Sequence, residues 1–306
     1  MAFLRILNLA PKIFLKFQYR YSHLFTWGQQ IPVDLCCRRG LSNFGITKPH
    51  SHANFEGMRF LLLAFLLCLL LTIGCVNNGV APYYYNYAVV FWPFDGSGSI
   101  ADGTSIVPFI GPSGTATNAN GTGMAFVPGY VNQAIFFDGI DDSISIPNNP
   151  LLKPLLPISI SAWVNLASAA TNMTVLATDK WSSTSVYCGV YFGVTTVGIS
   201  VQIGDCGGTG STHRLSYGAT TPLQVGNWYQ VTVVIQSPSN LTFYLNGVNV
   251  AITSTSGTGT GLTYSSWFSS IGADNFGDHF NGKIDELAFW QVALTAQNVA
   301  TIVNRN

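Results

Sequence analysis

The sequence is poor in charged residues. Asp, Glu, Lys and Arg make up only 8% of its 306 residues, where about a quarter is typical of soluble domains. The formal charge of zero averages two unlike parts, because residues 1–59 hold eight of the thirteen basic side chains, whereas residues 60–306 hold five basic and eleven acidic ones. A body with a formal charge of −6 cannot neutralise a phosphate backbone, so the composition excludes nucleic-acid binding.

The chain also lacks an apolar run that is long enough to cross a bilayer. Its longest run, residues 60–73, follows Arg59 and has fourteen residues. As a helix it would span about 21 Å, whereas the hydrocarbon core is about 30 Å thick. A basic residue before a short apolar segment is typical of a secretory signal, which we place at residues 58–74. A short signal anchor is the alternative, and both predict an extracytoplasmic protein that is secreted or held in the cell envelope.

The end of this segment resembles a bacterial lipoprotein signal, in which a cysteine that follows a small residue is acylated and becomes the new N-terminus. Gly74 precedes Cys75 here, and Thr72 stands where leucine is usual. The resemblance implies lipidation at Cys75, followed by a polar, tyrosine-rich tether over residues 75–87. Ordinary signal cleavage is the alternative. Contact with a membrane is then limited to the lipid anchor or the signal segment.

Residues 1–57 precede the signal and have no sustained hydrophobic period. Because a signal does not work well 57 residues inside a chain, we expect translation to start at Met58 and this doubtful leader to be an artefact. Its basic, acid-poor opening would also permit a targeting presequence. Peptides from residues 1–57 in the purified precursor would contradict the first interpretation.

Cysteine is scarce after Cys75, where only Cys188 and Cys206 remain. An isolated pair in an exported protein is a candidate disulfide. If the segment between them is a hairpin that pairs Thr195 with Ile199, the same register sets the two cysteines directly opposite each other, within disulfide range. Two free thiols are the alternative. The histidines of this region form no zinc-ligand pattern.

From Ala88 onward, short apolar runs alternate with turns rich in Gly, Ser, Thr and Asn, and a helical period is found only at residues 294–303. In the clearest unit, Asn246-Gly247 favours a type I′ hairpin turn. The predicted pairs about this turn are Leu245 with Val248, Phe243 with Val250, and Leu241 with Ile252. Apolar and polar residues also alternate over residues 158–165 and 231–235. This pattern predicts an all-β fold over residues 88–306, an antiparallel two-sheet sandwich of jelly-roll type.

Five ordered motifs of this region resemble the laminin-G-like domains of the concanavalin A-like lectin/glucanase superfamily, in the variant common in bacterial surface proteins. The motifs are VVFWPFD at 89–95, GYVNQAIFFDG with the following DD at 129–142, ISISAWVN at 158–165, GNWY with the later FYLNG at 226–247, and GKIDELAFW with ALT at 282–295. The resemblance covers about residues 88–304. It implies a jelly-roll sandwich in which the first and last motifs lie close together.

The superfamily includes glycoside hydrolases, so catalysis has to be considered. The usual hydrolytic route needs two carboxyl groups about 5–9.5 Å apart across the scissile bond. Beyond residue 60 the only glutamate is Glu286, directly after Asp285, and neighbouring strand residues point to opposite faces. Asp141 and Asp142 lie on a predicted turn, and no nucleophile elbow or phosphate loop occurs. We therefore expect no enzymatic activity, and a glycoside hydrolase is the least favoured function.

Calcium is the cofactor that the acidic residues suit, because hard cations take carboxylate and carbonyl oxygens from Gly- and Asn-rich turns. The resemblance implies that Asp95 lies near Asp285. The spacing of Ile284 and Leu287 breaks strict alternation, so we expect either a bulge or a buried carboxylate between them. We predict a structural calcium that involves Asp95 and Asp285, with Asp138 as a further ligand. The alternative is that these carboxylates cap turns.

Carbohydrate binding uses aromatic faces beside amide, carboxylate and hydroxyl groups. Candidates around the cysteine hairpin are Trp181, Tyr187 and Tyr191. Candidates in the later loops are Tyr264, Trp267, Phe268, Asp274, Asn275 and His279. Core packing is the alternative for each aromatic residue, and it is the role we expect for the tryptophans within the family motifs.

The sequence therefore predicts a non-catalytic, exported domain at the cell surface that recognises a carbohydrate or glycoconjugate. The alternative is a structural or adhesive envelope lipoprotein that binds protein partners and no small ligand. The expected partner is accordingly a glycan or a cell-surface protein.

Overall fold

The computed structural model describes residues 87–169, 172–179 and 186–304. The doubtful leader at 1–57, the signal at 58–74, the lipidation site Cys75 and the tether up to residue 86 lie outside these ranges, as does Trp181. Among the residues that the structure describes, no helix combines the length and the apolar character needed to cross a membrane.

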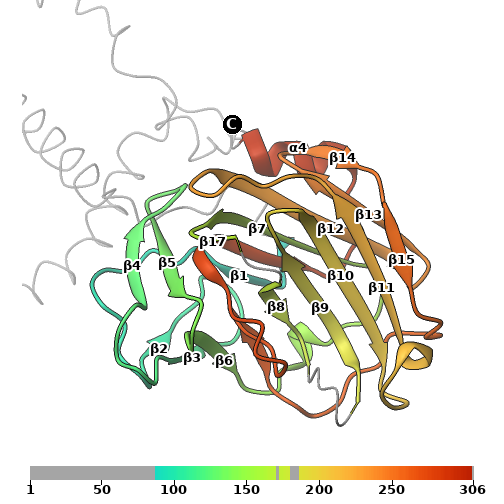
Figure 1. The fold of residues 1–306 in the computed structure, drawn as a ribbon, viewed down its shortest axis with the longest axis horizontal. Coiled ribbons are helices and arrows are strands. Elements are labelled where there is room, and N and C mark those ends of the chain that lie inside the picture. The colour runs from blue at the N-terminus through green and yellow to red at the C-terminus, as the bar shows by residue number, and fades with distance from the viewer. Residues whose placement is uncertain (1–86, 170–171, 180–185, 305–306) are drawn as a thin grey trace, which may run out of the picture. The chain divides into compact units, whose positions relative to one another are not determined.

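In the described part of the chain, two antiparallel sheets pack face to face, and the first has eight strands (Figure 1). Seven of these strands follow one another in the order β14 (Val248–Val250), β13 (Asn240–Leu245), β12 (Trp228–Ser237), β7 (Ile158–Leu166), β17 (Asn281–Trp290), β5 (Gln133–Asp138) and β4 (Ala125–Pro128). The eighth, β1 (Val90–Trp92), pairs with β17, with Val90 opposite Phe289. The first and last family motifs are therefore adjacent, as the resemblance implied.

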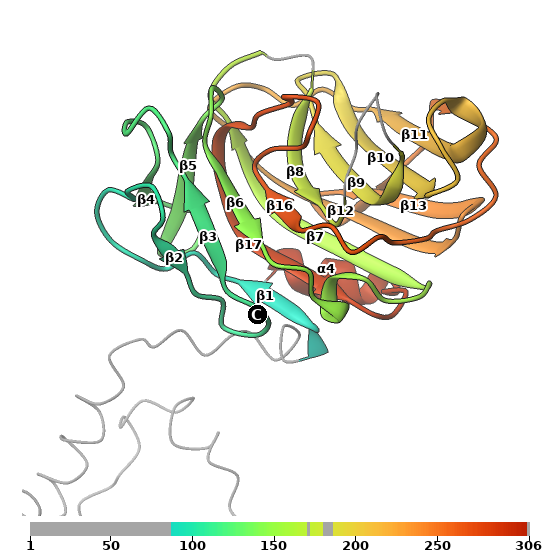
Figure 2. The ribbon, with the colours of Figure 1, turned by 90° about the horizontal axis from the view of Figure 1, so that it is seen from below.

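The second sheet has nine strands among the described residues and can be followed in Figure 2 from β3 to β11. Its strands are, in order, β15 (Ser254–Ser256), β11 (Arg214–Thr220), β10 (Gly198–Asp205), β9 (Cys188–Val194), β8 (Met173–Ala177), β16 (Ser269–Ile271), β6 (Ser143–Ile146), β3 (Gly114–Thr117) and β2 (Ser105–Ile106). The described helical turns are η3 (Pro150–Leu152), η4 (Ser211–His213) and the helix α4 (Ala296–Asn304). The predicted antiparallel two-sheet sandwich is confirmed.

The main core fills the space between the two sheets. Because successive strand residues point to opposite faces, each strand contributes every second side chain to this core. Fully buried examples are Ile158, Ile160, Ala162 and Val164 from β7, and Val190, Phe192 and Val194 from β9. Burying one Val, Ile or Phe side chain contributes about 1.5–3 kcal/mol relative to leaving it in water. The alternation predicted for residues 158–165 is confirmed on this inward face.

The outward face of β7 is also buried, which the alternating pattern did not predict. Ser159, Ser161, Trp163 and Asn165 are all buried. The segment after β17 folds back over this face, where the Ser159 hydroxyl accepts a hydrogen bond from the Leu294 backbone N–H at 3.0 Å. A strand that looks half-polar in the sequence is therefore covered on both sides.

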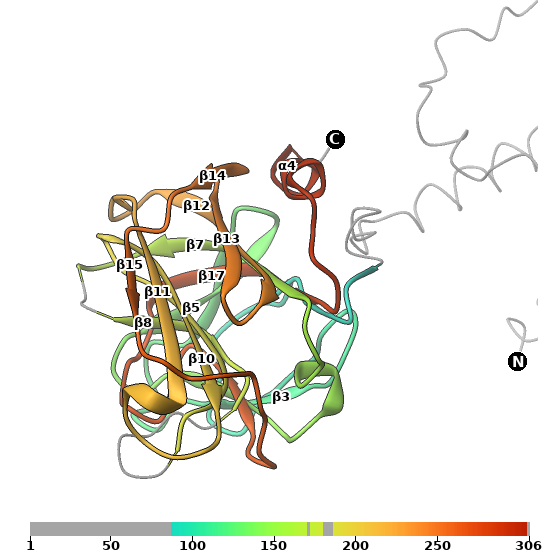
Figure 3. The same ribbon diagram turned by 90° about the vertical axis from the view of Figure 1, so that its right-hand side faces the viewer.

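Helix α4 forms a second, smaller core on the same outward face. Figures 1 and 3 both show α4 beside β14, and the two elements are in contact. Val299 and Ile302 of α4 are buried against Trp290 of β17, together with Ala88 and Phe91 at the start of the sandwich. The predicted C-terminal helix is thus confirmed, beginning two residues later than expected, and it closes part of the first sheet to solvent.

The Asn-Gly hairpin has the predicted turn and two of its three predicted pairs. Leu245 lies opposite Val248 and Phe243 opposite Val250, and both turn residues have positive φ, 49° and 81°. The third predicted pair is wrong, because β14 ends two residues before Ile252. The chain then crosses to the second sheet, where β15 pairs with β11.

The predicted disulfide between Cys188 and Cys206 is confirmed, but the predicted register is wrong by one residue. Cys188 lies opposite Asp205, because the hairpin closes with a two-residue turn between Thr195 and Gly198, whose backbone groups bond to each other. Cys206 follows the strand with a φ of 61°. This local turn brings the two Cα atoms to 4.5 Å.

Candidate functional site

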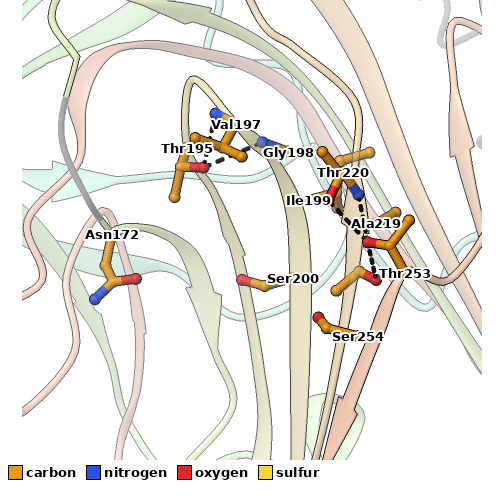
Figure 4. A pocket seen from close by; sticks show the side chains of 11 residues that line it. Asn172, Thr195, Val197, Gly198, Ile199, Ser200, Ala219, Thr220, Thr253 and Ser254 are labelled. Atoms are coloured by element: carbon orange, nitrogen blue, oxygen red, sulfur yellow. Dashed lines mark hydrogen bonds between the residues drawn. The ribbon is translucent and has the colours of Figure 1, made fainter.

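A small open pocket lies on the outward face of the second sheet, over β10, β11 and β15 (Figure 4). Its volume is about 170 Å³, below the roughly 300–1,000 Å³ of pockets that enclose drug-sized ligands. Figure 4 places Asn172 on one side and the Thr220–Thr253 pair on the other, with Ser200 between them. The pocket can therefore hold one ring of a longer ligand rather than a whole ligand.

Glycines at outward-facing strand positions leave the floor of the pocket open. Gly198 of β10 and Gly218 of β11 both line it. A Cβ atom at Gly198 would collide with the carbonyl oxygen of Ala219, so the close approach of the two strands requires glycine there. A Cβ atom at Gly218 would lie 2.6 Å from the Ser254 hydroxyl. Since this neighbour is a flexible side chain, a substitution at Gly218 would fill the pocket rather than distort the sheet.

Hydroxyl groups form most of the polar wall. The Thr253 hydroxyl accepts a hydrogen bond from the Thr220 backbone N–H at 2.9 Å and lies 2.8 Å from the Thr220 hydroxyl. On the β9–β10 turn, the Thr195 hydroxyl accepts hydrogen bonds from two backbone N–H groups. Ser200 and Ser254 complete the hydroxyl lining, and none of the described residues that line the pocket is charged. These groups suit a neutral, polar ligand.

The two tyrosines predicted to bind sugar lie on the same face of the sheet as the pocket, but both side chains are buried. Tyr187 and Tyr191 are 7% and 3% exposed. The ring of Tyr187 stacks against Phe276 at 6.1 Å, and the guanidinium of Arg214 lies 4.9 Å from its centroid. Burial raises the pKa of the Tyr191 phenol, and the carboxylates of the β16–β17 loop add to this shift. The Tyr187 ring therefore packs against this loop, and the buried Tyr191 phenol lies within electrostatic reach of the carboxylates of the loop.

The predicted loop residues Asp274, Asn275 and His279 belong to this β16–β17 loop. The Asp274 carboxylate accepts hydrogen bonds from the backbone N–H groups of Phe276 and Asp278, at 2.8 and 3.1 Å. Burial raises the pKa of Asp274 to about 6, and the nearby charge of Asp278 adds to the rise. Asn275 is exposed. The carboxylate that organises the loop therefore takes up a proton at a higher pH than an exposed aspartate does.

One hydrogen bond connects this loop to the pocket. Burial raises the pKa of Asp278, while a hydrogen bond from the side chain of Asn172 opposes this rise. Asn172 lines the pocket. The structure thus brings Tyr191, Asp274 and the pocket wall together, although none of the residues predicted to bind sugar lines the pocket.

Trp267 lies apart from the pocket lining. The residue is 40% exposed, and its ring packs beside Phe268 with the centroids 5.5 Å apart. The Trp267 carbonyl accepts a hydrogen bond from Lys153, whose ammonium group also pairs with the buried Asp179 at 3.0 Å. The predicted sugar-binding residues that the structure describes therefore lie at three places, which are β9 with the residue before it, the β16–β17 loop and this separate location.

The two carboxylates predicted to share a calcium hold the same turn, residues 129–133. Asp95 accepts hydrogen bonds from the Gln133 backbone N–H at 3.1 Å and from the Asn132 side chain at 3.2 Å. Asp285 accepts one from the Val131 backbone N–H at 2.9 Å. Both carboxylates therefore cap this turn, as the alternative interpretation expected. Calcium binding at Asp95 and Asp285 stays a prediction.

The third predicted calcium ligand, Asp138, lies with different partners. One ligand atom each from Asp138, Asp141 and Asp142 can be chosen so that all three lie within 4.8 Å of one another. Burial raises the pKa of Asp142 to about 6, and repulsion from the other two carboxylates contributes to this shift. The three side chains form an acidic cluster on the β5–β6 connection.

Asp285 and Glu286, an adjacent acidic pair within β17, are both inaccessible. They are 0% and 3% exposed. The predicted bulge is confirmed, because the register of β17 against β7 shifts between Asp285 and Ala288, and Glu286 has a φ of 51°. Neither carboxyl group can reach a polysaccharide from this position.

The pocket was not predicted from the sequence, because its residues are small and come from separate strands. Alternation of Gly and hydroxyl residues on the outward positions of neighbouring strands is the signal that could have found it. Gly198-Ile-Ser200 and Gly218-Ala-Thr220 are the two segments that carry this pattern.

A family model for the concanavalin A-like lectin/glucanases superfamily matches residues 138–300. Domain 4 of AbnA, a GH43 extracellular arabinanase from Geobacillus stearothermophilus, in complex with arabinotriose, is 20% identical with a TM-score of 0.50. The match covers 71% of this chain and 98% of that one. The binding domain of botulinum neurotoxin DC in complex with SialylT is 12% identical, also with a TM-score of 0.50.

The match to the neurotoxin domain covers 72% of this chain and 52% of that one, so the present chain corresponds to about half of that structure. Among curated protein sequences, none matches the chain. At these identities the two solved structures share the fold with this chain.

Proposed function

This chain belongs to the concanavalin A-like lectin/glucanases superfamily, and we propose that its sandwich is a non-catalytic domain that binds a neutral carbohydrate in the pocket over β10, β11 and β15. The observation that carries the proposal is the uncharged, hydroxyl-lined pocket with its glycine floor. The arabinanase domain of the same fold, in complex with arabinotriose, supports it by analogy.

The size and chemistry of the pocket define the expected ligand. A volume of about 170 Å³ leaves room for one sugar ring, with the rest of the chain outside. Hydroxyl groups donate and accept, so they match the hydroxyls of a sugar, and each such hydrogen bond contributes a net of about 0.5–1.5 kcal/mol. With few such bonds, a single site binds weakly, with a Kd on the order of 1 mM. Tight attachment would then require several copies on one polysaccharide.

We propose no catalytic activity, because the adjacent carboxyl groups on β17 are buried. Asp285 and Glu286 are inaccessible, and Asp285 already accepts a hydrogen bond from the turn that it holds. The pocket itself offers no charged lining residue in the described part of the chain. A general acid and a nucleophile are therefore both missing from the lining described.

We also propose that the domain works outside the cytoplasm, exported by the segment at residues 58–74 and anchored through a lipid at Cys75. The disulfide between Cys188 and Cys206 supports this proposal, because disulfides persist in oxidising compartments.

A glycan array tests the proposal, with the full chain and three variants. Gly218→Val fills the floor of the pocket and Ser254→Ala removes a lining hydroxyl. Ser256→Ala is the matched control, because Ser256 lies on the same face of the same strand but does not line the pocket. We expect Gly218→Val to abolish binding, Ser254→Ala to weaken it roughly threefold or more, and Ser256→Ala to leave it unchanged.

Two outcomes would contradict this function. Binding that survives Gly218→Val in a folded protein would place the sugar elsewhere. If no glycan on the array binds and the protein still adheres to cells, the alternative in which the domain binds a protein partner would be favoured.

A further inference from the structure

Large apolar side chains are exposed at the end of the sandwich where the described chain begins. They come from the residues before β1, before β16 and after β17, and from the β6–β7 connection, residues 147–157. The exposed side chains of this surface, which we call the apolar end, are Tyr87, Leu151, Leu155, Trp267, Phe268 and Val292. In Figure 3 the start of β1 and the green turn η3 lie on the right-hand side, whereas β11 and β15 lie on the left.

The register of the first sheet brings three of these segments together. Ser159, the second residue of β7, lies opposite Trp290 at the end of β17, and its hydroxyl donates a hydrogen bond to the Val292 carbonyl at 2.8 Å. Leu155 lies just before β7. Ala88, beside the first described residue, packs in the same small core as Trp290. The start of the described chain and the two segments therefore lie at one end of this sheet.

The second sheet adds the fourth segment. Ser269 at the start of β16 lies opposite Ile146 at the end of β6. Trp267 and Phe268 precede β16, and the β6–β7 connection, which carries Leu151, follows β6. The two aromatic side chains are therefore beside this connection.

A buried ion pair fixes the backbone that carries Trp267. The ammonium group of Lys153 pairs with the Asp179 carboxylate at 3.0 Å. It also donates hydrogen bonds to the carbonyls of Ser265 and Trp267, at 2.8 and 2.6 Å. The Asp179 carboxylate accepts a further hydrogen bond from the Ser265 hydroxyl at 2.6 Å. Because the backbone is already ordered, the exposed ring loses less conformational freedom when it contacts a surface.

The apolar end has no unpaired charge. Lys153, which is paired with Asp179, is the only charged residue in the segments that form this end, which are residues 87–88, 147–158, 264–269 and 291–294. The carboxylates of the acidic cluster precede β6, whereas the β6–β7 connection follows it. This surface can therefore leave water without the cost of desolvating an unpaired ion.

The chain enters the sandwich at this end, from residues 75–86. These twelve residues span at most about 43 Å when fully extended. With a lipid at Cys75, the apolar end stays within that distance of the bilayer. A tether makes a second, weak contact effective, because the contact becomes intramolecular.

We propose that the apolar end contacts the lipid bilayer that holds the chain, a contact that rests on the anchoring through Cys75 proposed above. Aromatic rings such as that of Trp267 are enriched at the level of the lipid headgroups, and the strength of such binding increases with the apolar area buried. The contact adds to the lipid anchor and the signal segment, which are the membrane contacts expected from the sequence.

This arrangement directs the sugar pocket away from the membrane. Asn172, which lines the pocket, precedes β8, whereas Asp179 of the buried ion pair follows β8. The pocket and the apolar end therefore lie at opposite ends of this strand. A domain that rests on the bilayer through the apolar end keeps its pocket open to a polysaccharide outside the cell.

Tryptophan quenching in the full chain on vesicles tests the proposal. The vesicles are phosphatidylcholine with brominated acyl chains, which quench a nearby indole, and unbrominated vesicles are the reference. Trp267→Phe should lower the quenched fraction of the emission at least about twofold, because the ring at the membrane is lost. Trp228→Phe is the matched control and should leave the quenched fraction unchanged, because Trp228 pairs with Asn165 at the far end of β7.

A pair of charged substitutions tests the same contact without removing a tryptophan. Leu155 and Val248 are 78% and 68% exposed, so Leu155→Asp and Val248→Asp should both fold, which circular dichroism verifies. Leu155→Asp should lower the quenched fraction at least about twofold, because a carboxylate resists transfer into the bilayer. Val248→Asp, at the Asn-Gly turn, should have no effect.

Sedimentation with the vesicles measures anchoring separately from this contact. A chain that sediments with the vesicles but is quenched equally in Trp267→Phe would overturn the contact and leave the anchor in place. A chain that does not sediment would overturn both. Quenching that requires anionic lipid, or is lost in about 0.5 M NaCl, would also overturn the proposal, because the apolar end offers no unpaired cation. The sugar pocket is tested independently by the glycan array.

Discussion

The Asp285 carboxylate accepts a hydrogen bond from the Val131 backbone N–H at 2.9 Å, across 154 positions of the sequence. Asp285 is fully buried at the bulge of β17. The bulge breaks the alternation of the strand and allows a carboxylate to hold the 129–133 turn against the first sheet. The hydrogen bond from Val131 therefore explains why a charged residue, Asp285, occurs within the mostly apolar strand β17.

Asp285→Ala should lower the free energy of unfolding by about 1–3 kcal/mol, because the Val131 N–H, in a part-buried hydrogen bond, loses its acceptor. Asp95→Ala is the matched control, since Asp95 is exposed and holds the same turn. Its loss should be smaller, because water can replace the carboxylate. Urea denaturation of both variants measures the two values. Equal losses would show that burial of Asp285 is not what makes its contact important.

Removal of the disulfide should also destabilise the domain. The cysteines are 18 positions apart, and closing a loop of this length contributes about 3 kcal/mol by restricting the unfolded chain. The double variant Cys188→Ala, Cys206→Ala should show this loss in urea denaturation. An unchanged unfolding midpoint would contradict the prediction that the disulfide stabilises the domain.

Asp274 predicts a pH dependence of stability. Burial raises its pKa from 3.8 to about 6 in the folded protein, so the protonated side chain favours folding. This contribution is complete below about pH 4 and is lost as the pH rises through 6. The side chain in Asp274→Asn does not ionise. The stability of this variant relative to the unmodified chain should therefore increase as the pH rises from about 4 to 7. Thermal unfolding across this range measures it, and a difference that does not vary with pH would contradict the assignment.

The small core under α4 should contribute measurably to stability. Ile302 is 1% exposed and packs in this core, so Ile302→Ala should cost about 2–5 kcal/mol. Gln297→Ala, on the exposed side of the same helix, should change stability by about 0.5 kcal/mol or less. If thermal unfolding shows similar effects for both variants, the helix does not form part of the cooperative unit.

The fold was predictable because its strands carry local signals. The Asn246-Gly247 turn requires positive φ at both positions, and these two residue types tolerate it, so the register about this turn followed. The turn of the cysteine hairpin, Thr196-Val197, has no such signal. Its length was therefore misjudged by one residue, and the pairing of Cys188 moved with it.

The candidate site was less predictable, because it depends on contacts between distant segments. The pocket combines Asn172, the β9–β10 turn and strand β15, which no periodicity connects. The acidic cluster was partly predictable, since Asp138 was named as a ligand, but the burial of Asp142 arises only in the folded chain. Tyr187 and Tyr191 match the aromatic pattern of a sugar site in the sequence, but both are buried in the folded protein.

The position of α4 has a practical consequence for handling the protein. Ala88 and Phe91, near the first described residue, pack in the same small core as Val299 and Ile302 of α4. Both ends of the described sandwich therefore emerge at the outward face of the first sheet, whereas the pocket opens on the outward face of the second. Coupling to a solid support through either end holds the pocket toward the solution, so immobilised display needs no long spacer.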